Sequence, residues 1–111
     1  MREILSENQI DPLALKFISN NHIEIVQEIS NAISKNDWVV VGMAQNPLVK
    51  TAKKYLENKG QSPLYIEYGS SFSKWKERLA IKIWSGWPTF PQVFHKGKLI
   101  GGFKDLERYE F

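Results

Sequence analysis

Few side chains in this sequence could carry chemistry. The chain contains two histidines, His22 and His95, and no cysteine. Without cysteine it has no disulfide, no thiolate ligand for zinc or an iron–sulfur cluster, and no thiol nucleophile. The histidines lack the spacing of a metal site, so we expect both at the surface and no metal bound. Ser85, His95 and Asp105 could be assembled into a nucleophile–base–acid set, but nothing marks Ser85 as a nucleophile. We therefore predict no catalytic residue.

The most informative polar position is Asn46. It follows the β-branched run of residues 39–41 and precedes Pro47 and a stretch with helical spacing. Asparagine and proline in this order are typical of a helix start, where the amide oxygen accepts hydrogen bonds from free backbone N–H groups. Such a helix start also attracts anions and thiolates. Asn46 is thus predicted to cap a helix, with or without a ligand contact.

Composition limits the class of protein. The chain has 111 residues, 42% of them hydrophobic, which suits one compact domain. The net charge of +3 comes from 15 basic and 12 acidic side chains that are interspersed, so we expect no nucleic-acid partner. No apolar run approaches the roughly 20 residues of a membrane span. The first ten residues lack the apolar core of a secretory signal, and we expect a cytoplasmic protein without membrane association.

Apolar spacing predicts the elements that position these residues. Helices are expected over 12–19, 22–36, 47–59, 70–86 and 103–111, and strands over 37–44, 63–68 and both halves of 91–102, with a turn at 96–97. The helix at 70–86 is expected to start at Ser70 or Ser71 and to turn Phe72, Trp75, Leu79 and Ile83 toward the core. The amphipathic faces of the first two helices, which carry Leu13, Phe17, Ile18, Ile23, Val26 and Ile29, also require burial.

The order of elements indicates an α/β fold. Strand, helix and strand over 37–68 form a βαβ unit, whose strands are expected to be parallel with a right-handed crossover. Adding the next helix, the hairpin and the last helix gives a four-stranded mixed sheet with helices on both faces. Residues 1–35 are predicted to form an N-terminal helical extension and residues 36–111 the main domain.

Three sequence blocks make the fold assignment more specific. The segment WPTFPQVF, from Trp87, has the pattern of a cis X–Pro bond at Pro91 entering a strand. The segment GKLIGGFKDL places Gly101 and Gly102 before Asp105 at the start of the last helix. With the helix start at Asn46, these blocks resemble the glutaredoxins, and in particular the monothiol class, which share the thioredoxin-like three-layer fold. Asn46-Pro47-Leu48-Val49 then falls on the family's C-P-Y-C or C-G-F-S motif, with Asn46 in place of the reactive cysteine.

The resemblance implies a glutathione-type groove. Glutaredoxins hold glutathione by backbone pairing beside the cis-proline, by cations at its glycyl carboxylate and by the G-G block at its γ-glutamyl end. Arg78 and Lys82 match basic positions of the monothiol class, and Arg78 is the candidate for the carboxylate, the alternative being a solvated side chain. The implied ligand-binding residues are Asn46, Pro47, Arg78, Thr89, Phe90, Pro91, Gly101, Gly102, Phe103, Lys104 and Asp105.

Two departures from the family pattern weaken this groove. The cation that usually precedes the cysteine corresponds to Met43, and the loop that carries an essential lysine in the monothiol class is shortened to GMAQ. Lys104 also replaces a small or acidic residue at the γ-glutamyl end. The resemblance therefore leaves glutathione as a candidate ligand, beside an extended peptide or partner protein that would pair with the backbone at Pro91.

The resulting functional hypothesis is a cysteine-free glutaredoxin-related binding or adaptor module without redox catalysis. By resemblance it is linked to redox homeostasis or iron–sulfur cluster handling, with a BolA-type or cluster-assembly protein as the candidate partner. The chain itself has no thiol for a metal or a cluster. The alternative is a glutathione-dependent oxidoreductase or transferase in which bound glutathione supplies the thiol. That enzyme needs a group to lower the pKa of the thiol, and the sequence offers only the helix start after Asn46.

Overall fold

The computed structural model describes residues 2–70 and 73–111. Its elements are η1 (Glu7–Gln9), α1 (Pro12–Asn20), α2 (Ile23–Lys35), β1 (Trp38–Gly42), α3 (Pro47–Asn58), β2 (Leu64–Glu67), α4 (Trp75–Ser85), β3 (Gln92–His95), β4 (Lys98–Gly101) and α5 (Phe103–Glu107). Among the described residues, no helix is long and apolar enough to cross a membrane.

One mixed sheet organises the molecule, in the strand order β2-β1-β3-β4. β1 pairs with β2 in parallel and with β3 antiparallel, and β3 pairs with β4 across the turn at Lys96-Gly97. Both turn residues have positive φ, as a tight two-residue hairpin requires. The predicted βαβ unit, hairpin and four-stranded mixed sheet are confirmed.

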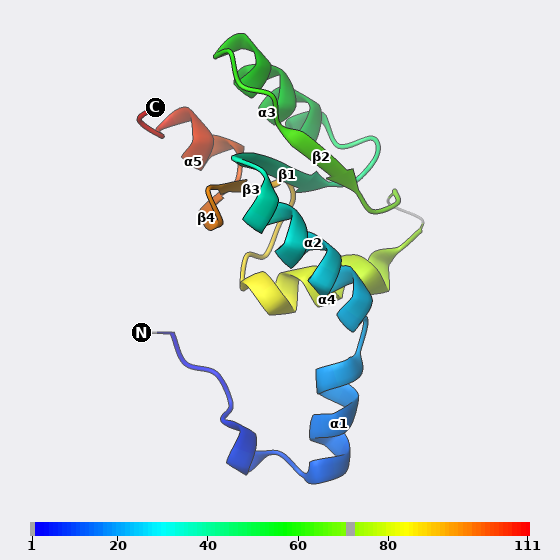
Figure 1. Cartoon of the computed structure of the whole chain (residues 1–111). Helices are drawn as coiled ribbons and strands as arrows, with labels where there is room; N and C mark the ends of the chain where they lie inside the picture. Colours follow the sequence, from blue (N-terminus) through cyan, green and yellow to red (C-terminus); the bar gives the residue numbers. More distant parts are fainter. Residues whose placement is uncertain (1, 71–72) are drawn as a thin grey trace.

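Helices cover both faces of the sheet (Figure 1). Every residue of β1 is buried, as its unbroken apolar sequence predicts for a central strand. Successive β1 side chains point alternately to the two faces of the sheet. They pack into two hydrophobic cores, one under α2 and α4 and one under α3 and α5. The first core contains Ile29, Val39, Val41, Tyr68, Ile81, Phe90 and Phe94, and the second Trp38, Val40, Ala52, Leu56, Val93 and Leu106.

The prediction for α4 was wrong in two respects. The helix begins at Trp75, with Lys74 in the left-handed region before it, because Ser70 and Ser73 bond to each other in a preceding turn. Ser70 is therefore not the cap, and the proposed Ser71 and Phe72 lie outside the described residues. The expected inner face is also exposed: Trp75 is 59% and Ile83 66% accessible, and Leu79 is exposed too.

The opposite face of α4 is the buried one. It places Ala80 and Ile81 on the core, together with the charged residue Arg78. Apolar spacing misjudged the rotation because it considers only apolar residues, whereas the charged Arg78 is also buried, with its guanidinium held by backbone carbonyls.

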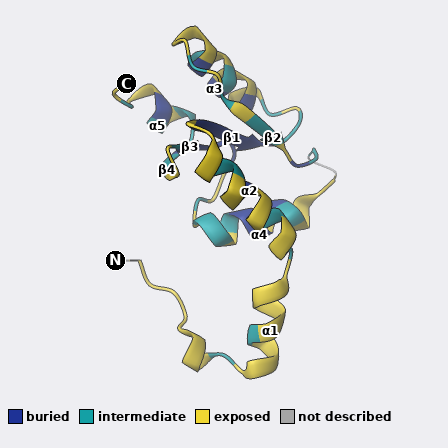
Figure 2. Cartoon of the chain, in the orientation of Figure 1, coloured by how far each residue is buried: buried dark blue, intermediate teal, exposed yellow. Residues whose placement is uncertain are grey.

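The two predicted N-terminal helices differ in their packing. α2 lies on the sheet and against α4, and its Ile29 is fully buried. α1 has no buried residue and stands away from the sheet (Figures 1 and 2). We call residues 2–20 the arm. Most of the apolar face that the sequence predicts for α1 is therefore uncovered, and the boundary at residue 35 stays a prediction.

Candidate functional site

Asn46 caps α3 as predicted. Its Oδ1 accepts hydrogen bonds from the backbone N–H of Leu48 at 3.0 Å and of Val49 at 3.3 Å. Pro47 occupies the first helical position, where its missing N–H costs nothing. The free donors at the helix start are thus taken up by a side chain of the same segment.

The same amide reaches a second segment of the chain. Asn46 Nδ2 donates to the carbonyl oxygen of Phe90 at 3.3 Å, although the two residues are 44 positions apart. Phe90 precedes Pro91, and the bond between them is cis, as predicted. Asn46 therefore links the start of α3 to the cis-proline loop, and it does so with both polar atoms of its amide.

Gly42, the last residue of β1, allows α3 to sit this close. A Cβ at Gly42 would lie 2.6 Å from Cγ1 of Val49, well inside van der Waals contact. The first turn of α3 therefore packs directly on the end of the strand, and this packing fixes the position of Asn46.

The G-G block forms the other side of the site. Gly101 has a φ of +118°, and the Gly102 N–H donates to Asp105 Oδ2 at 2.9 Å. A Cβ at Gly101 would lie 2.5 Å from the same carboxylate oxygen, so only glycine fits there. A Cβ at Gly102 would lie 3.6 Å from both Pro91 O and Trp87 Nε1. The glycine turn and the cis-proline loop are therefore neighbours.

Two polar atoms beneath this region are buried without a partner among the described residues: Trp87 Nε1 and Gln92 Oε1. Other polar groups of the W-P-T-F-P-Q block have partners: Gln92 Nε2 donates to Trp87 O at 3.0 Å, and the Trp87 N–H donates to Ser85 Oγ at 3.1 Å. Buried polar atoms usually have partners. Trp87 Nε1, next to Gly102, is thus a buried donor without a partner in the described part of the chain.

Arg78 has different neighbours from the site residues described so far. Its guanidinium is buried, and Nη1 donates to the backbone carbonyls of Tyr68, at 2.9 Å, and Ser73. The alternative of a solvated Arg78 is wrong, and its role in holding a carboxylate stays a prediction. Tyr68 is itself anchored, since its hydroxyl donates to Glu28 at 2.9 Å. Burial, followed by Glu28, raises the pKa of Tyr68 above its ordinary value, so its hydroxyl remains a donor.

Lys82 is the cation that the structure brings to the cis-proline loop. Its Nζ lies 5.6 Å from the centre of the Phe90 ring, a cation–π distance. Both Arg78 and Lys82 match basic positions of the family, and sequence reasoning chose Arg78. The two residues lie one turn apart on the same face of α4. Arg78 is held by the carbonyls of Tyr68 and Ser73, whereas Lys82 reaches the Phe90 ring.

The remaining predicted residues are only partly gathered. Thr89 is exposed on the loop before Phe90, and Lys104 is exposed on α5. The Phe103 ring packs edge-on against Tyr55 of α3, with 5.8 Å between ring centres. Asn46, Pro47, Phe90, Pro91, Gly101, Gly102 and Asp105 form the compact part of the site.

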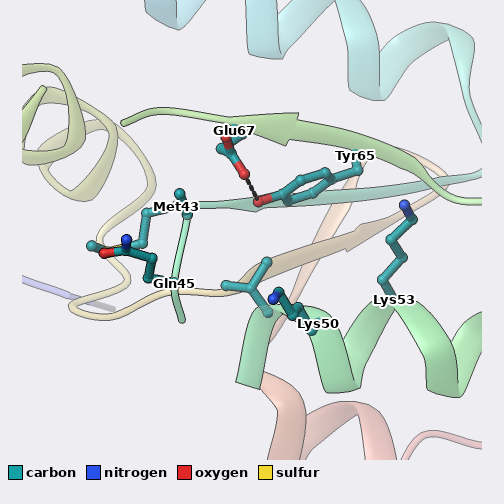
Figure 3. Close-up of a pocket in the computed structure, with 8 residues that line it drawn as sticks. Met43, Gln45, Lys50, Lys53, Tyr65 and Glu67 are labelled. Atoms are coloured by element: carbon teal, nitrogen blue, oxygen red, sulfur yellow. Dashed lines mark hydrogen bonds between the residues drawn. The ribbon is translucent and has the colours of Figure 1, made fainter. Parts of the chain in front are cut away.

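A pocket that the sequence did not predict lies between the start of α3 and the edge strand β2 (Figure 3). It encloses about 390 Å³ and is lined by Met43, Ala44, Gln45, Val49, Lys50, Lys53, Tyr65 and Glu67. The Tyr65 hydroxyl donates to Glu67 Oε1 at 2.8 Å. Burial, followed by Glu67, raises the pKa of Tyr65, so the phenol stays protonated and is not a base. No short-range signal in the sequence brings the loop at 43–45 to Tyr65.

Comparison with known proteins supports the geometry. The family model described as Glutaredoxin matches residues 47–100. A "Glutaredoxin-like protein" of Dictyostelium discoideum is 49% identical over 89 residues, which are 80% of this chain and 72% of that protein. A mutated buckwheat glutaredoxin superposes with a TM-score of 0.70 at 23% identity, over 81% of this chain and 82% of its own. A buckwheat glutaredoxin–glutathione complex gives a TM-score of 0.68 at 23% identity, over 79% and 80%.

Proposed function

This chain belongs to the glutaredoxin family, and from this premise we propose that it is a binding protein that retains the family's glutathione-type groove without thiol chemistry. The observation that carries the proposal is the position of Asn46. By resemblance it occupies the site of the reactive cysteine, and its amide takes the N–H groups of Leu48 and Val49. A carboxamide is a poor nucleophile and a poor ligand for iron–sulfur clusters, which favour thiolates.

The groove keeps several features that suit glutathione. The backbone at Phe90 and Pro91 is held in the conformation that can pair with an extended peptide. The turn at Gly101-Gly102 lies next to Trp87 Nε1, a buried donor without a partner in the described part of the chain. Buckwheat glutaredoxin, which has a similar fold, forms a complex with glutathione. Lys82, beside Phe90, is our candidate for the glycyl carboxylate.

A backbone-amide NMR titration with millimolar reduced glutathione tests this groove. We expect shifts at Asn46 to Leu48, at Phe90, Gln92 and Gly101 to Asp105, and none from an equal mixture of glutamate and glycine. Lys82→Ala should weaken binding about two- to five-fold, as expected for one exposed ion pair. The matched control is Lys76→Ala on the same helix, which should leave binding unchanged. A silent spectrum would exclude glutathione as the ligand.

An Asn46→Cys variant tests whether position 46 corresponds to the reactive cysteine of the family. With the amide gone, the N–H groups of Leu48 and Val49 are free to stabilise a thiolate at the helix start. We expect glutathione-dependent reduction of a glutathionylated substrate: the introduced thiolate takes up glutathione and releases the substrate thiol, and a second glutathione then removes the first as its disulfide. Ser19→Cys, on the exposed arm, is the control and should be inactive.

The same assay separates this proposal from the enzymatic alternative. If the wild-type chain reduces the substrate at a rate above that of glutathione alone, then bound glutathione supplies the thiol and the binding-module proposal is wrong. If Asn46→Cys is folded but inactive, the groove does not present glutathione to the start of α3.

We also propose a macromolecular partner. By resemblance to the monothiol glutaredoxins, it is a BolA-type or cluster-assembly protein, and the two act in redox homeostasis in the cytoplasm. Leu48 is half exposed beside the cis-proline loop and could contact such a partner. Co-purification with the candidate partner, and its loss in a Leu48→Glu variant with retained fold, is the expected result.

A further inference from the structure

Uncovered apolar side chains gather on the arm and on α4. Leu13 is 79% and Phe17 69% accessible on α1, and α4 exposes Trp75, Leu79 and Ile83. Figure 2 shows α1 as an almost wholly exposed helix below the sheet. Scattered apolar residues are normal at a surface, but a contiguous set on two facing elements marks an interaction site.

The two elements enclose a groove. It measures about 320 Å³ and lies between the C-terminal half of α1, the start of α2 and α4, with Phe17, Ile18, Ile23, Val26, Ile83 and Trp84 among its lining residues. Apart from Arg2, whose guanidinium donates to Ser85 O at 3.5 Å, the arm makes few contacts with its own α4. The groove therefore has apolar walls and room for further side chains.

The apolar side chains exposed on these elements are numerous. The arm, the first residue of α2 and α4 together expose nine large apolar side chains: Ile4, Leu5, Leu13, Phe17, Ile18, Ile23, Trp75, Leu79 and Ile83. Aromatic side chains bury roughly 150–250 Å² each, and Phe17 and Trp75 are more than half exposed; the seven aliphatic side chains add to the area that these two offer. A standard interface buries about 800 Å² on each partner.

The charges on the two elements are complementary. The arm carries Glu3, Glu7 and Asp11 against Arg2 and Lys16, so it is net acidic. At the start of α4, Lys74 and Lys76 are exposed and Glu77 is partly exposed, so this end of the helix is net basic. An arm of one copy laid on α4 of another would thus pair opposite charges around an apolar centre, as interfaces usually do.

We propose that this surface binds a second copy of the chain, with the arm of each copy packed on α4 of the other. Such an exchange is isologous, because the same surface is used twice and the contact closes on itself. It leaves the groove at Asn46 and Pro91 free, and it is independent of the function proposed above.

Sedimentation equilibrium or light scattering gives the first test. We expect twice the 12.9 kDa of one chain. Interfaces of this size bind with micromolar or tighter affinity, so a chain that stays monomeric at about 100 μM would overturn the proposal and leave the surface to a different partner. Phe17→Glu and Ile83→Glu should each give monomers, whereas Leu64→Glu, a partly exposed apolar position on β2, should leave the dimer intact. A dimer insensitive to both arm and α4 variants would also overturn it.

The absence of cysteine permits a direct test of the geometry. Two chains of distinguishable mass, one with Phe17→Cys and one with Ile83→Cys, are mixed and mildly oxidised. Each has one thiol, so a bond between them joins two copies. We expect the mixed disulfide to dominate, with little bonding when Leu64→Cys replaces Ile83→Cys. Equal bonding in both mixtures would show random collision and contradict the arm exchange.

Discussion

Two helices of this chain begin with almost the same residues and end up in opposite environments. α1 starts with Asp11-Pro12-Leu13 and α3 with Asn46-Pro47-Leu48. Both caps accept a hydrogen bond from the backbone N–H two positions on, at 3.1 Å in α1 and 3.0 Å in α3. Yet α3 buries Val49, Ala52 and Leu56, while α1 buries nothing.

The comparison teaches that local residues decide where a helix starts but not what it covers. α3 is placed by Gly42 beneath it and by the hydrogen bond from Asn46 to Phe90, neither of which has a counterpart in α1. That hydrogen bond needs the amide N–H₂ of asparagine. An aspartate in its place, as in α1, would cap equally well but could not donate.

The largest difference between α3 and α1 is expected when a leucine of each helix is replaced by alanine. Leu56→Ala should lower the free energy of unfolding by about 2–5 kcal/mol, because it leaves a cavity beside Trp38 and Val40. Leu13→Ala should change it by less than about 0.5 kcal/mol in dilute solution, since the side chain is exposed. Urea denaturation of both variants measures the difference, and similar losses would mean that α1 packs on its own domain.

The second-largest difference is expected when the N-cap residue of each helix is replaced. Asn46→Asp places a carboxylate oxygen against the carbonyl of Phe90 in a part-buried site, and we expect a loss of roughly 1–3 kcal/mol. Asp11→Asn should be within about 0.5 kcal/mol of the wild type, because its cap is exposed and both residues cap well. Denaturation at pH 7 compares them. Equal effects would show that Phe90 O has no energetic role in holding Asn46.

The smallest effect concerns pH. His95 is the last residue of β3. Its ring stacks on Trp38, with 3.9 Å between ring centres, and its Nδ1 is hydrogen-bonded to the Tyr109 hydroxyl at 2.7 Å. Burial, followed by the charge of Lys96, lowers the pKa of His95 from its ordinary 6.5. The unfolded chain therefore binds this proton more readily, so stability is complete above about pH 6.5 and decreases as the pH falls below it. His95→Gln should flatten this decrease below about pH 6.5, and an unchanged slope would assign it to other groups.

Much of the fold could be predicted because its signals are local. Asp11-Pro12 and Asn46-Pro47 mark helix starts, residues 39–41 mark a buried strand, and the W-P-T-F-P block marks the cis-proline. The missed features depend on distant segments. The inner face of α4 is set by Arg78 bonding to Tyr68 and Ser73 carbonyls, and the role of Asn46 includes a partner 44 residues away.

The proximity of Gly42 and Val49 has a consequence for how such a site can change over evolutionary time. The strand end packs against Val49 in the first turn of α3. Any side chain at position 42 would displace α3 from the strand end, whereas a different capping residue at position 46 would leave that contact in place. The residue beneath the helix is therefore more constrained over evolutionary time than the residue that caps it.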